Sequence, residues 1–146
     1  MKGYIYFDMD GVLAGLYDVP NWLSYLLDND PYPYLAAAPL VNLSRLARIL
    51  NRLQREGYHI GIVSWLSKNG TTEYNKEVTL AKKEWLRRHL PSVLWDEIKI
   101  VPYGVPKQEV VNFSEGILFD DEVNNRNNWR GQAYDETQIF EILKIF

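Results

Sequence analysis

The chain carries Tyr4-Ile5-Tyr6-Phe7-Asp8-Met9-Asp10-Gly11-Val12-Leu13 near its beginning, and this stretch decides the fold. Its first four residues are apolar or aromatic and predict a buried strand that runs directly into Asp8 and Asp10. Two carboxylates side by side at a strand end repel each other unless a cation or a reaction uses them. An aspartate there can be a metal ligand or a nucleophile in phosphoryl transfer. Because Asp and Gly also form ordinary turns, the stretch alone leaves a structural role open.

Two later stretches repeat the pattern of a polar group placed after an apolar run, and a lysine lies between them. Residues 61–63 lead into Ser64, and residues 116–119 lead into Asp120 and Asp121. Between them, Lys107 opens a short helical pattern after a proline. In an open parallel sheet, the carboxyl ends of the strands form the edge that binds ligands, so we expect these groups to meet there.

The alternation of strand-like and helix-like segments predicts an α/β fold. We expect a doubly wound, Rossmann-like parallel sheet with helices on both faces and a short cap insert after the first strand. Strands are predicted at residues 3–8, 58–63, 98–101 and 116–119, with a short one at 132–134. Helices are predicted at residues 21–27, 39–56, 73–89 and after a capping-box signal at 135–138, with a turn-rich segment at 28–33.

The order Asp-x-Asp, Ser, Lys, Asp-Asp resembles the motif order of the haloacid dehalogenase (HAD) superfamily of phosphotransferases. The resemblance extends from Tyr4 to about Trp129. The four motifs are matched in turn by residues 8–12, Ser64, Lys107 and the pair Asp120-Asp121. It implies one HAD-like hydrolase domain over residues 1–146, with the cap insert at about 14–38.

Within the superfamily, residues 8–14 look like the 5′(3′)-deoxyribonucleotidases and their phage and bacterial relatives. The segment Lys82-Lys83-Glu84-Trp85 is similar to that group as well. Two departures concern specificity. Gly15 and Leu16 stand where that group has an Asp and a base-stacking aromatic residue, and Trp65-Leu66 replaces its common Ser-Pro. These departures affect the expected nucleotide specificity and leave the expected phosphatase chemistry intact.

The resemblance gives the first motif its chemical roles. Asp8 is expected to be the nucleophile, which forms an aspartyl-phosphate that water then hydrolyses. Asp10 is expected to protonate the leaving alcohol and then to activate the attacking water. The family also uses the backbone carbonyl at the position of Asp10 as a metal ligand. A strand-end Asp that only caps a turn is the alternative for Asp8.

A Mg²⁺ site and a phosphate site complete the expected chemistry. Asp120 and Asp121 would join Asp8 and Asp10 around Mg²⁺, which prefers carboxylates, waters and phosphate oxygens. The sequence does not distinguish which member of the Asp120-Asp121 pair touches the metal, and a surface turn is the alternative for both. The phosphate-binding residues are expected to be Ser64, Trp65 and Lys107, with a helix-capping Ser and a solvated Lys as the alternatives.

The cap insert is rich in aromatic residues. In HAD proteins an insert at this position covers the site and selects substrates. Its aromatic side chains could stack on a nucleotide base, but we favour the interpretation that they form the insert's own small core. The aromatic residues are Tyr17, Trp22, Tyr25, Tyr32 and Tyr34. A short insert would leave the site open to larger or varied substrates.

Composition limits the remaining possibilities. The chain has 146 residues, of which 47% are hydrophobic, a formal net charge of -3 and no cysteine. It can therefore form a core but no disulfide or thiolate metal site, and it is not expected to bind nucleic acid generally. We see no leader or membrane-spanning run and expect a cytoplasmic protein.

The expected partner is a small phosphate ester, with nucleoside monophosphates as the leading candidates. The alternatives are a polynucleotide-end phosphatase, a sugar phosphatase or phosphotransferase, and a non-catalytic HAD-fold binding module. Nucleic acid is expected only as a phosphorylated end. Lys82 is a weaker candidate for binding phosphate. The basic residues Lys82, Lys83, Arg87 and Arg88 are instead expected on the solvated face of their helix.

Overall fold

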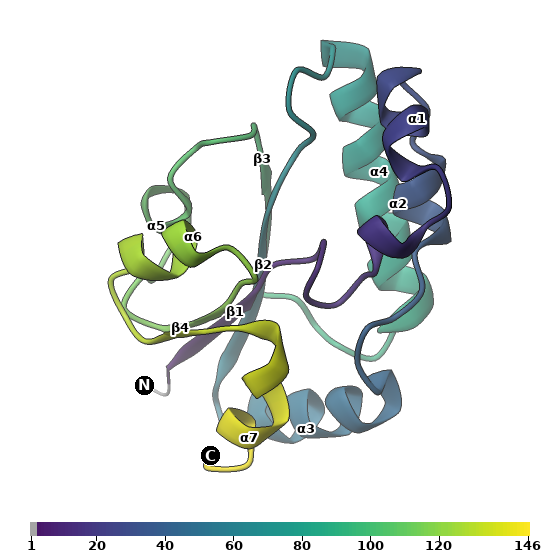
Figure 1. Ribbon diagram of the computed structural model, residues 1–146. Coiled ribbons are helices and arrows are strands. Elements are labelled where there is room, and N and C mark those ends of the chain that lie inside the picture. Colours follow the sequence, from purple (N-terminus) through teal and green to yellow (C-terminus); the bar gives the residue numbers. More distant parts are fainter. Residues whose placement is uncertain (1–2) are drawn as a thin grey trace.

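A five-stranded parallel sheet forms the centre of the computed structural model, which describes residues 3–146 (Figure 1). Its strands follow the order β3-β2-β1-β4-β5, and every neighbouring pair is parallel. The bounds are β1 (Tyr4–Phe7), β2 (His59–Trp65), β3 (Glu97–Val101), β4 (Ile117–Phe119) and β5 (Ala133–Tyr134). After β1, the chain forms β2 and β3 on one side of this strand and then β4 and β5 on its other side. This order confirms the predicted Rossmann-like α/β fold and places a switch point between β1 and β4.

Helices flank the sheet and form the insert after β1. They are η1 (Leu16–Asp18), α1 (Trp22–Leu27), α2 (Tyr32–Ala36), α3 (Leu43–Arg55), α4 (Thr72–His89), α5 (Lys107–Val110), α6 (Val123–Asn128), η2 (Glu136–Gln138) and α7 (Ile139–Leu143). The side chains of Asn42 and Thr71 cap α3 and α4 by accepting backbone N–H bonds at 3.0 and 3.1 Å. The predicted capping box at Asp135 and Gln138 is present and opens η2.

The predicted turn at residues 28–33 is only partly correct. The helix α2 begins at Tyr32 and carries Pro33 in its first turn. Proline is tolerated there because the first backbone N–H groups of a helix have no partner within the helix. The sequence alone suggested a turn because Pro31 and Pro33 lie so close together.

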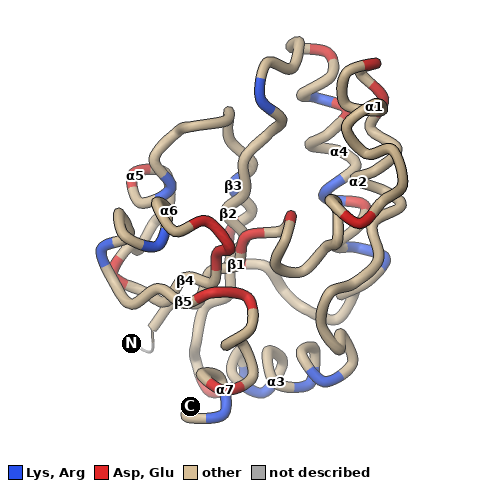
Figure 2. The backbone as a smooth tube through the Cα atoms, in the orientation of Figure 1, with Lys and Arg blue, Asp and Glu red and all other residues tan. Residues whose placement is uncertain are grey.

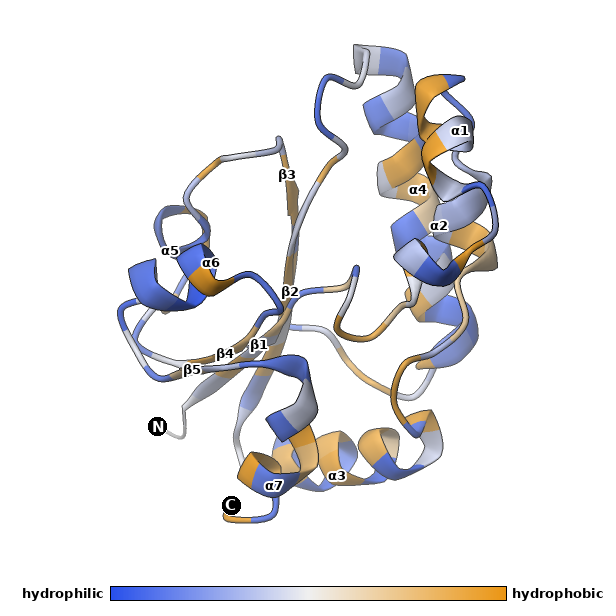
Figure 3. Ribbon diagram, viewed as in Figure 1, coloured by the Kyte–Doolittle hydropathy of each residue, from blue (hydrophilic) through white to orange (hydrophobic). Residues whose placement is uncertain are grey.

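Alternation along β1 sends side chains to both faces of the sheet. Ile5 and Phe7 join the large apolar cluster formed with α3, α7 and Trp85, whereas Tyr6 packs with Trp129 on the opposite face. Figure 3 shows apolar residues concentrated in the strands and in α3 and α7, while α5 and α6 are largely hydrophilic. Both faces of the sheet are therefore covered. Because β1 is the central strand, a functional group at its carboxyl end is shielded from solvent by both layers.

The insert lies against α4 (Figure 1). Tyr34 of α2 is buried in a second apolar cluster with Tyr74 and Val78 of α4. The indole N–H of Trp85 donates to the carbonyl of Ala37 at 2.8 Å, which ties the end of the insert to the same helix. The insert is thus attached to the body of the protein along its length. Within residues 3–146, no helix combines the length and the apolar character needed to cross a bilayer.

Candidate active site

Three carboxylates meet at the carboxyl ends of β1 and β4. Asp8 and Asp120 directly follow these strands, and the N–H of Asp8 donates to the carbonyl of Phe119 at 2.9 Å. One oxygen from each of Asp8, Asp120 and Asp121 lies within 4.8 Å of the others. Figure 2 shows this acidic group at the centre of the molecule, where the segments that follow β1 and β4 come close together. The parallel register of β1 and β4 explains why these side chains meet, because it places Phe7 opposite Phe119 and so aligns the ends of the two strands.

Gly11 allows Asp121 to reach this group. Its φ of +80° lies in the left-handed region, which glycine adopts without steric cost. A Cβ atom at this position would overlap the carboxylate of Asp121. The Asp-x-Asp-Gly sequence therefore has a steric reason for its glycine, beyond forming a turn.

Lys107 supplies positive charge from the first residue of α5. Its Nζ lies 2.6 Å from Asp120 Oδ2 and 3.3 Å from Asp8 Oδ1, and the side chain is 2% exposed. Burial alone lowers the pKa of Lys107, but Asp8 and Asp120 outweigh burial and raise that pKa above its usual range. Lys107 is therefore a firmly held ammonium group beside Asp8.

One ammonium group does not balance three carboxylates. Burial, followed by the charge on Asp8, raises the pKa of Asp120 to about 6. Burial and the charges of Asp8 and Asp120 raise the pKa of Asp121 to about 7. A set made of carboxylate oxygens fits Mg²⁺. Within residues 3–146, this is the one group of three or more acidic or histidine side chains close enough to hold a metal ion.

Asp120 and Asp121 occupy different positions. Asp120 is fully buried, and its two oxygens accept from Lys107, from Asn125 at 3.2 Å and from the N–H of Glu122 at 2.9 Å. Asp121 lines the open pocket above. Asn125 is a site residue that the sequence analysis missed, and its only signal was its place on the short helix directly after the Asp pair.

Asp10 forms an ion pair with Lys82. Lys82 Nζ lies 2.9 Å from Asp10 Oδ2, and it donates to Ser64 Oγ at 2.8 Å and to the carbonyl of Trp65 at 2.6 Å. Burial raises the pKa of Asp10 above its usual range, while Lys82 opposes that shift. A carboxyl group with a raised pKa therefore lies close to the charge of Asp8.

The prediction that Lys82 belongs to the solvated face of its helix is wrong. Lys82 is 1% exposed, whereas Lys83, Arg87 and Arg88 are exposed as expected. The spacing of Lys82 from its apolar neighbours in the sequence could have indicated that it is buried. Lys82 lies four residues after Val78 and three before Trp85, so it shares the buried face of α4 with both.

The predicted phosphate-binding residues all reach the pocket. Ser64 is fully buried near the end of β2 and lines the pocket floor with Asp8 and Lys107. The indole N–H of Trp65 donates to the carbonyl of Val105 at 2.8 Å, which fastens the loop before α5. The Trp65 ring lies 5.3 Å from Lys107 Nζ. The structure thus brings Asp8, Asp10, Ser64, Trp65, Lys107 and Asp121 to one pocket, with Asp120 buried beneath it.

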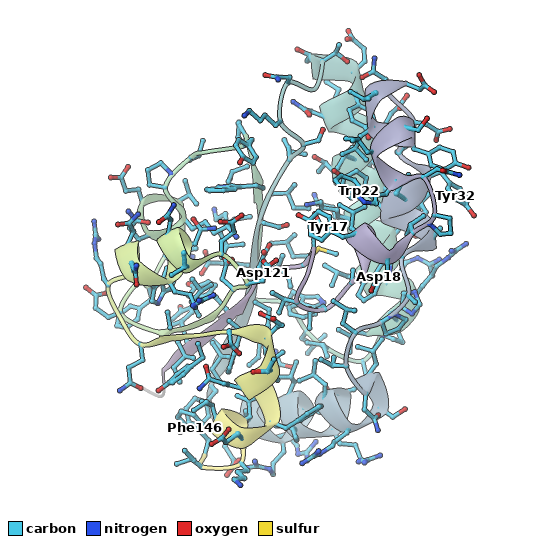
Figure 4. The ribbon with its side chains drawn as sticks, viewed as in Figure 1. Tyr17, Asp18, Trp22, Tyr32, Asp121 and Phe146 are labelled. Atoms are coloured by element: carbon cyan, nitrogen blue, oxygen red, sulfur yellow. The ribbon has the colours of Figure 1, made fainter. Side chains whose placement is uncertain are left out.

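The pocket has a volume of about 580 Å³ and opens between the insert and the loops that follow β2 and β3. Figure 4 shows Tyr17 and Trp22 of the insert on the side facing Asp121, whereas Tyr32 lies on the outer side of the insert. Burial raises the pKa of Tyr17, and the next contribution comes from Asp10, so its hydroxyl lies in the field of the carboxylates. The insert therefore forms one wall of the cleft above the acidic group.

Comparison with known proteins supports the fold. No protein-family model and no curated protein match the sequence. Among solved structures, the chain is similar to D,D-heptose 1,7-bisphosphate phosphatase from Burkholderia thailandensis, with a TM-score of 0.53, 15% identity, and 86% of this chain and 70% of that chain covered. It is also similar to the enzyme of the same name from B. bronchiseptica, solved with magnesium and phosphate, with a TM-score of 0.56, 14% identity, and 90% and 78% covered.

These similarities concern the fold and not the substrate. They match the HAD-like architecture that the order of the four motifs predicted. The resemblance to deoxyribonucleotidases finds no counterpart in them, because the two similar structures are named for a sugar bisphosphate. The protein therefore has a HAD-like α/β fold with an acidic cluster of Asp8, Asp120 and Asp121 at the switch point of its sheet.

Proposed function

We propose that this protein is a Mg²⁺-dependent phosphomonoester hydrolase that acts through an aspartyl-phosphate. The observation that carries the proposal is the convergence at one pocket of a buried Asp8, the ion pair of Asp10 with Lys82, and Lys107. This set supplies a nucleophile, an acid–base group and fixed positive charge within one cleft. A strand-end Asp that only caps a turn would require none of these neighbours.

In the first step, a carboxylate oxygen of Asp8 forms a bond to phosphorus, and the bond from phosphorus to the alcohol oxygen breaks. Asp10 gives its proton to the departing alcohol, and the raised pKa of Asp10 suits this role. Lys107 lies 3.3 Å from Asp8 and stabilises the negative charge on the transferring group.

In the second step, Asp10 takes a proton from water, and the water oxygen bonds to phosphorus while the aspartyl-phosphate bond breaks. The products are inorganic phosphate and a regenerated Asp8. A Mg²⁺ ion held by Asp8 and Asp121, with the Asp10 carbonyl and the buried Asp120, would neutralise the phosphate and allow an anionic nucleophile to approach. Ser64 lies on the pocket floor with its hydroxyl oriented by Lys82, where it can contact a phosphate oxygen.

Two substrate classes deserve parallel tests. Nucleoside monophosphates follow from the motif at residues 8–14, and sugar phosphates follow from the names of the two similar structures. The test measures phosphate release from both classes and from p-nitrophenyl phosphate, with Mg²⁺ and with EDTA. Release that needs Mg²⁺ and disappears in a folded Asp8→Asn variant supports the proposal. Release that survives Asp8→Asn contradicts the role of Asp8.

A further inference from the structure

The cleft above the reacting groups has apolar walls on both sides. The insert contributes Tyr17, Trp22, Leu23 and Leu27, and the opposite side contributes Trp65 and Tyr103. Tyr17 and Tyr103 are each 52% exposed, and Leu27 is 75% exposed. Large apolar side chains left open to solvent beside a reactive centre are typical of a surface that binds an apolar group.

Both walls are held in place without a ligand. Tyr34 and the bond from Trp85 to Ala37 attach the insert to α4. On the other side, Trp65 is fixed by its bond to Val105, and its ring packs against Tyr103 with the ring centres 4.9 Å apart. A leaving group would therefore meet a surface that is already formed, which reduces the entropy lost on binding.

Positive charge is scarce in the same cleft. In the described part of the chain, the pocket is lined by two basic side chains, Lys68 and Lys107. Lys107 is engaged by Asp8 and Asp120. Lys68 lies beside the Tyr103 ring, with its Nζ 5.9 Å from the ring centre, and Glu122 adds negative charge to the rim. A second phosphate would meet Lys68 and neutral polar side chains such as Ser67 and Asn69, but no arginine guanidinium from residues 3–146 that could bind it through two hydrogen bonds.

We propose that the substrate is a monophosphate ester whose leaving group is uncharged and carries a flat apolar ring held between the Tyr17–Trp22 wall and the Trp65–Tyr103 wall. This inference rests on the proposed phosphatase function. It separates this protein from an enzyme for sugar bisphosphates and from one for polynucleotide ends, because both substrates bring further negative charge into the cleft.

The test compares three alkyl phosphates in the presence of Mg²⁺: propyl phosphate, 3-phenylpropyl phosphate and propane-1,3-diol bisphosphate. Their alcohols ionise at similar pH, so differences in kcat/KM report binding of the distal group. We expect 3-phenylpropyl phosphate to exceed propyl phosphate by about tenfold or more, since a buried phenyl ring contributes that much. We expect the bisphosphate to be no better than propyl phosphate.

Variants locate the effect. Tyr103→Ala and Leu23→Ser alter opposite walls at half-exposed positions, and each should reduce the ratio of kcat/KM for the phenyl substrate to that for propyl phosphate about fivefold. Tyr32→Ala is the matched control, because Tyr32 is 49% exposed on the same insert but does not line the pocket. It should change neither rate.

The outcomes separate the two proposals. Equal rates for the phenyl and propyl substrates, or a preference of tenfold for the bisphosphate, would overturn the inference and leave the phosphatase function standing. An undiminished phenyl advantage in both wall variants would also overturn it. No Mg²⁺-dependent turnover of any of the three esters or of p-nitrophenyl phosphate would overturn both.

Discussion

Replacing Lys82 with methionine tests the electrostatic arrangement of the site through stability alone. Methionine keeps the length and apolar character of the lysine side chain but removes the ammonium group. Lys82 is 1% exposed and lies within 2.9 Å of Asp10, Ser64 and the Trp65 carbonyl. The change leaves the Asp10 carboxylate, 14% exposed, without its partner.

The expected loss follows from removing one member of a buried ion pair, which costs about 3–5 kcal/mol. A domain of this size has a total stability of about 5–15 kcal/mol, so this loss is a large fraction. Each kcal/mol lowers the Tm of such a domain by about 2–4 °C. We therefore expect Lys82→Met to melt about 6–20 °C below the wild-type protein at pH 7.5 in EDTA, measured by circular dichroism and checked by urea unfolding.

Two companion variants make the assay specific. Lys83→Met changes the neighbouring exposed lysine and should alter stability by less than about 0.5 kcal/mol. Combining Lys82→Met with Asp10→Asn should destabilise by less than the sum of the two single changes, because asparagine leaves no charge unpaired. A loss under about 1 kcal/mol for Lys82→Met, or strict additivity with Asp10→Asn, would refute the reasoning.

Three further predictions concern the carboxylates. Asp8→Asn should reduce phosphate release by about 10³-fold or more without lowering Tm, because it removes the nucleophile and one of three clustered charges. Burial and two neighbouring carboxylates raise the folded-state pKa of Asp121 to about 7, above its unfolded value near 4. The folded form therefore binds the extra proton, so this stabilisation is complete below about pH 4 and is lost as pH rises through about 7. The Tm of the EDTA-treated protein should accordingly fall between about pH 5 and pH 7.5 and change little above that range, and saturating Mg²⁺ should remove that fall, since the metal binds the deprotonated carboxylates. Gly11→Ala should lower Tm, because the φ of Gly11 is +80° and alanine is strained there. The added methyl group also displaces Asp121, so the variant should bind Mg²⁺ about tenfold more weakly in calorimetry. Unchanged Mg²⁺ affinity would argue against a role for Asp121 at the metal.

The sheet and the acidic group were predictable because they depend on local patterns. The apolar runs before Asp8, Ser64 and Asp120 mark strands, and parallel pairing then brings their ends together without further information. The role of Lys82 was misjudged because its charge was given more weight than its spacing from Trp85. A buried lysine requires acceptors from other segments, here Asp10 and the end of β2, and a helical pattern does not reveal them.

Only one wall of the cleft was open to sequence reasoning. Tyr17 and Trp22 were named as possible base-stacking residues, although a role in the insert's own core was favoured, and both line the pocket. Tyr17 lies in η1 and Tyr103 in the loop after β3, far apart in the chain, and neither position carries a motif. They face the same pocket only because the insert packs on α4 and the indole of Trp65 fastens the loop before α5. Such contacts depend on tertiary packing, so the substrate class could not follow from the motif order.

The charges at the site connect the metal, the mechanism and the substrate. Asp8, Asp10, Asp120 and Asp121 face two buried ammonium groups, those of Lys82 and Lys107, which leaves two negative charges uncompensated when all four carboxylates are ionised. One divalent cation brings this group to neutrality, and with Asp10 protonated for the first step the group carries one positive charge, which a phosphate dianion more than compensates. No spare positive charge then remains near the reacting groups for a second phosphate. In the proposal made above, the part of the substrate beyond the ester oxygen gains its binding energy mainly from apolar contact, and the walls around Tyr17 and Tyr103 offer that contact.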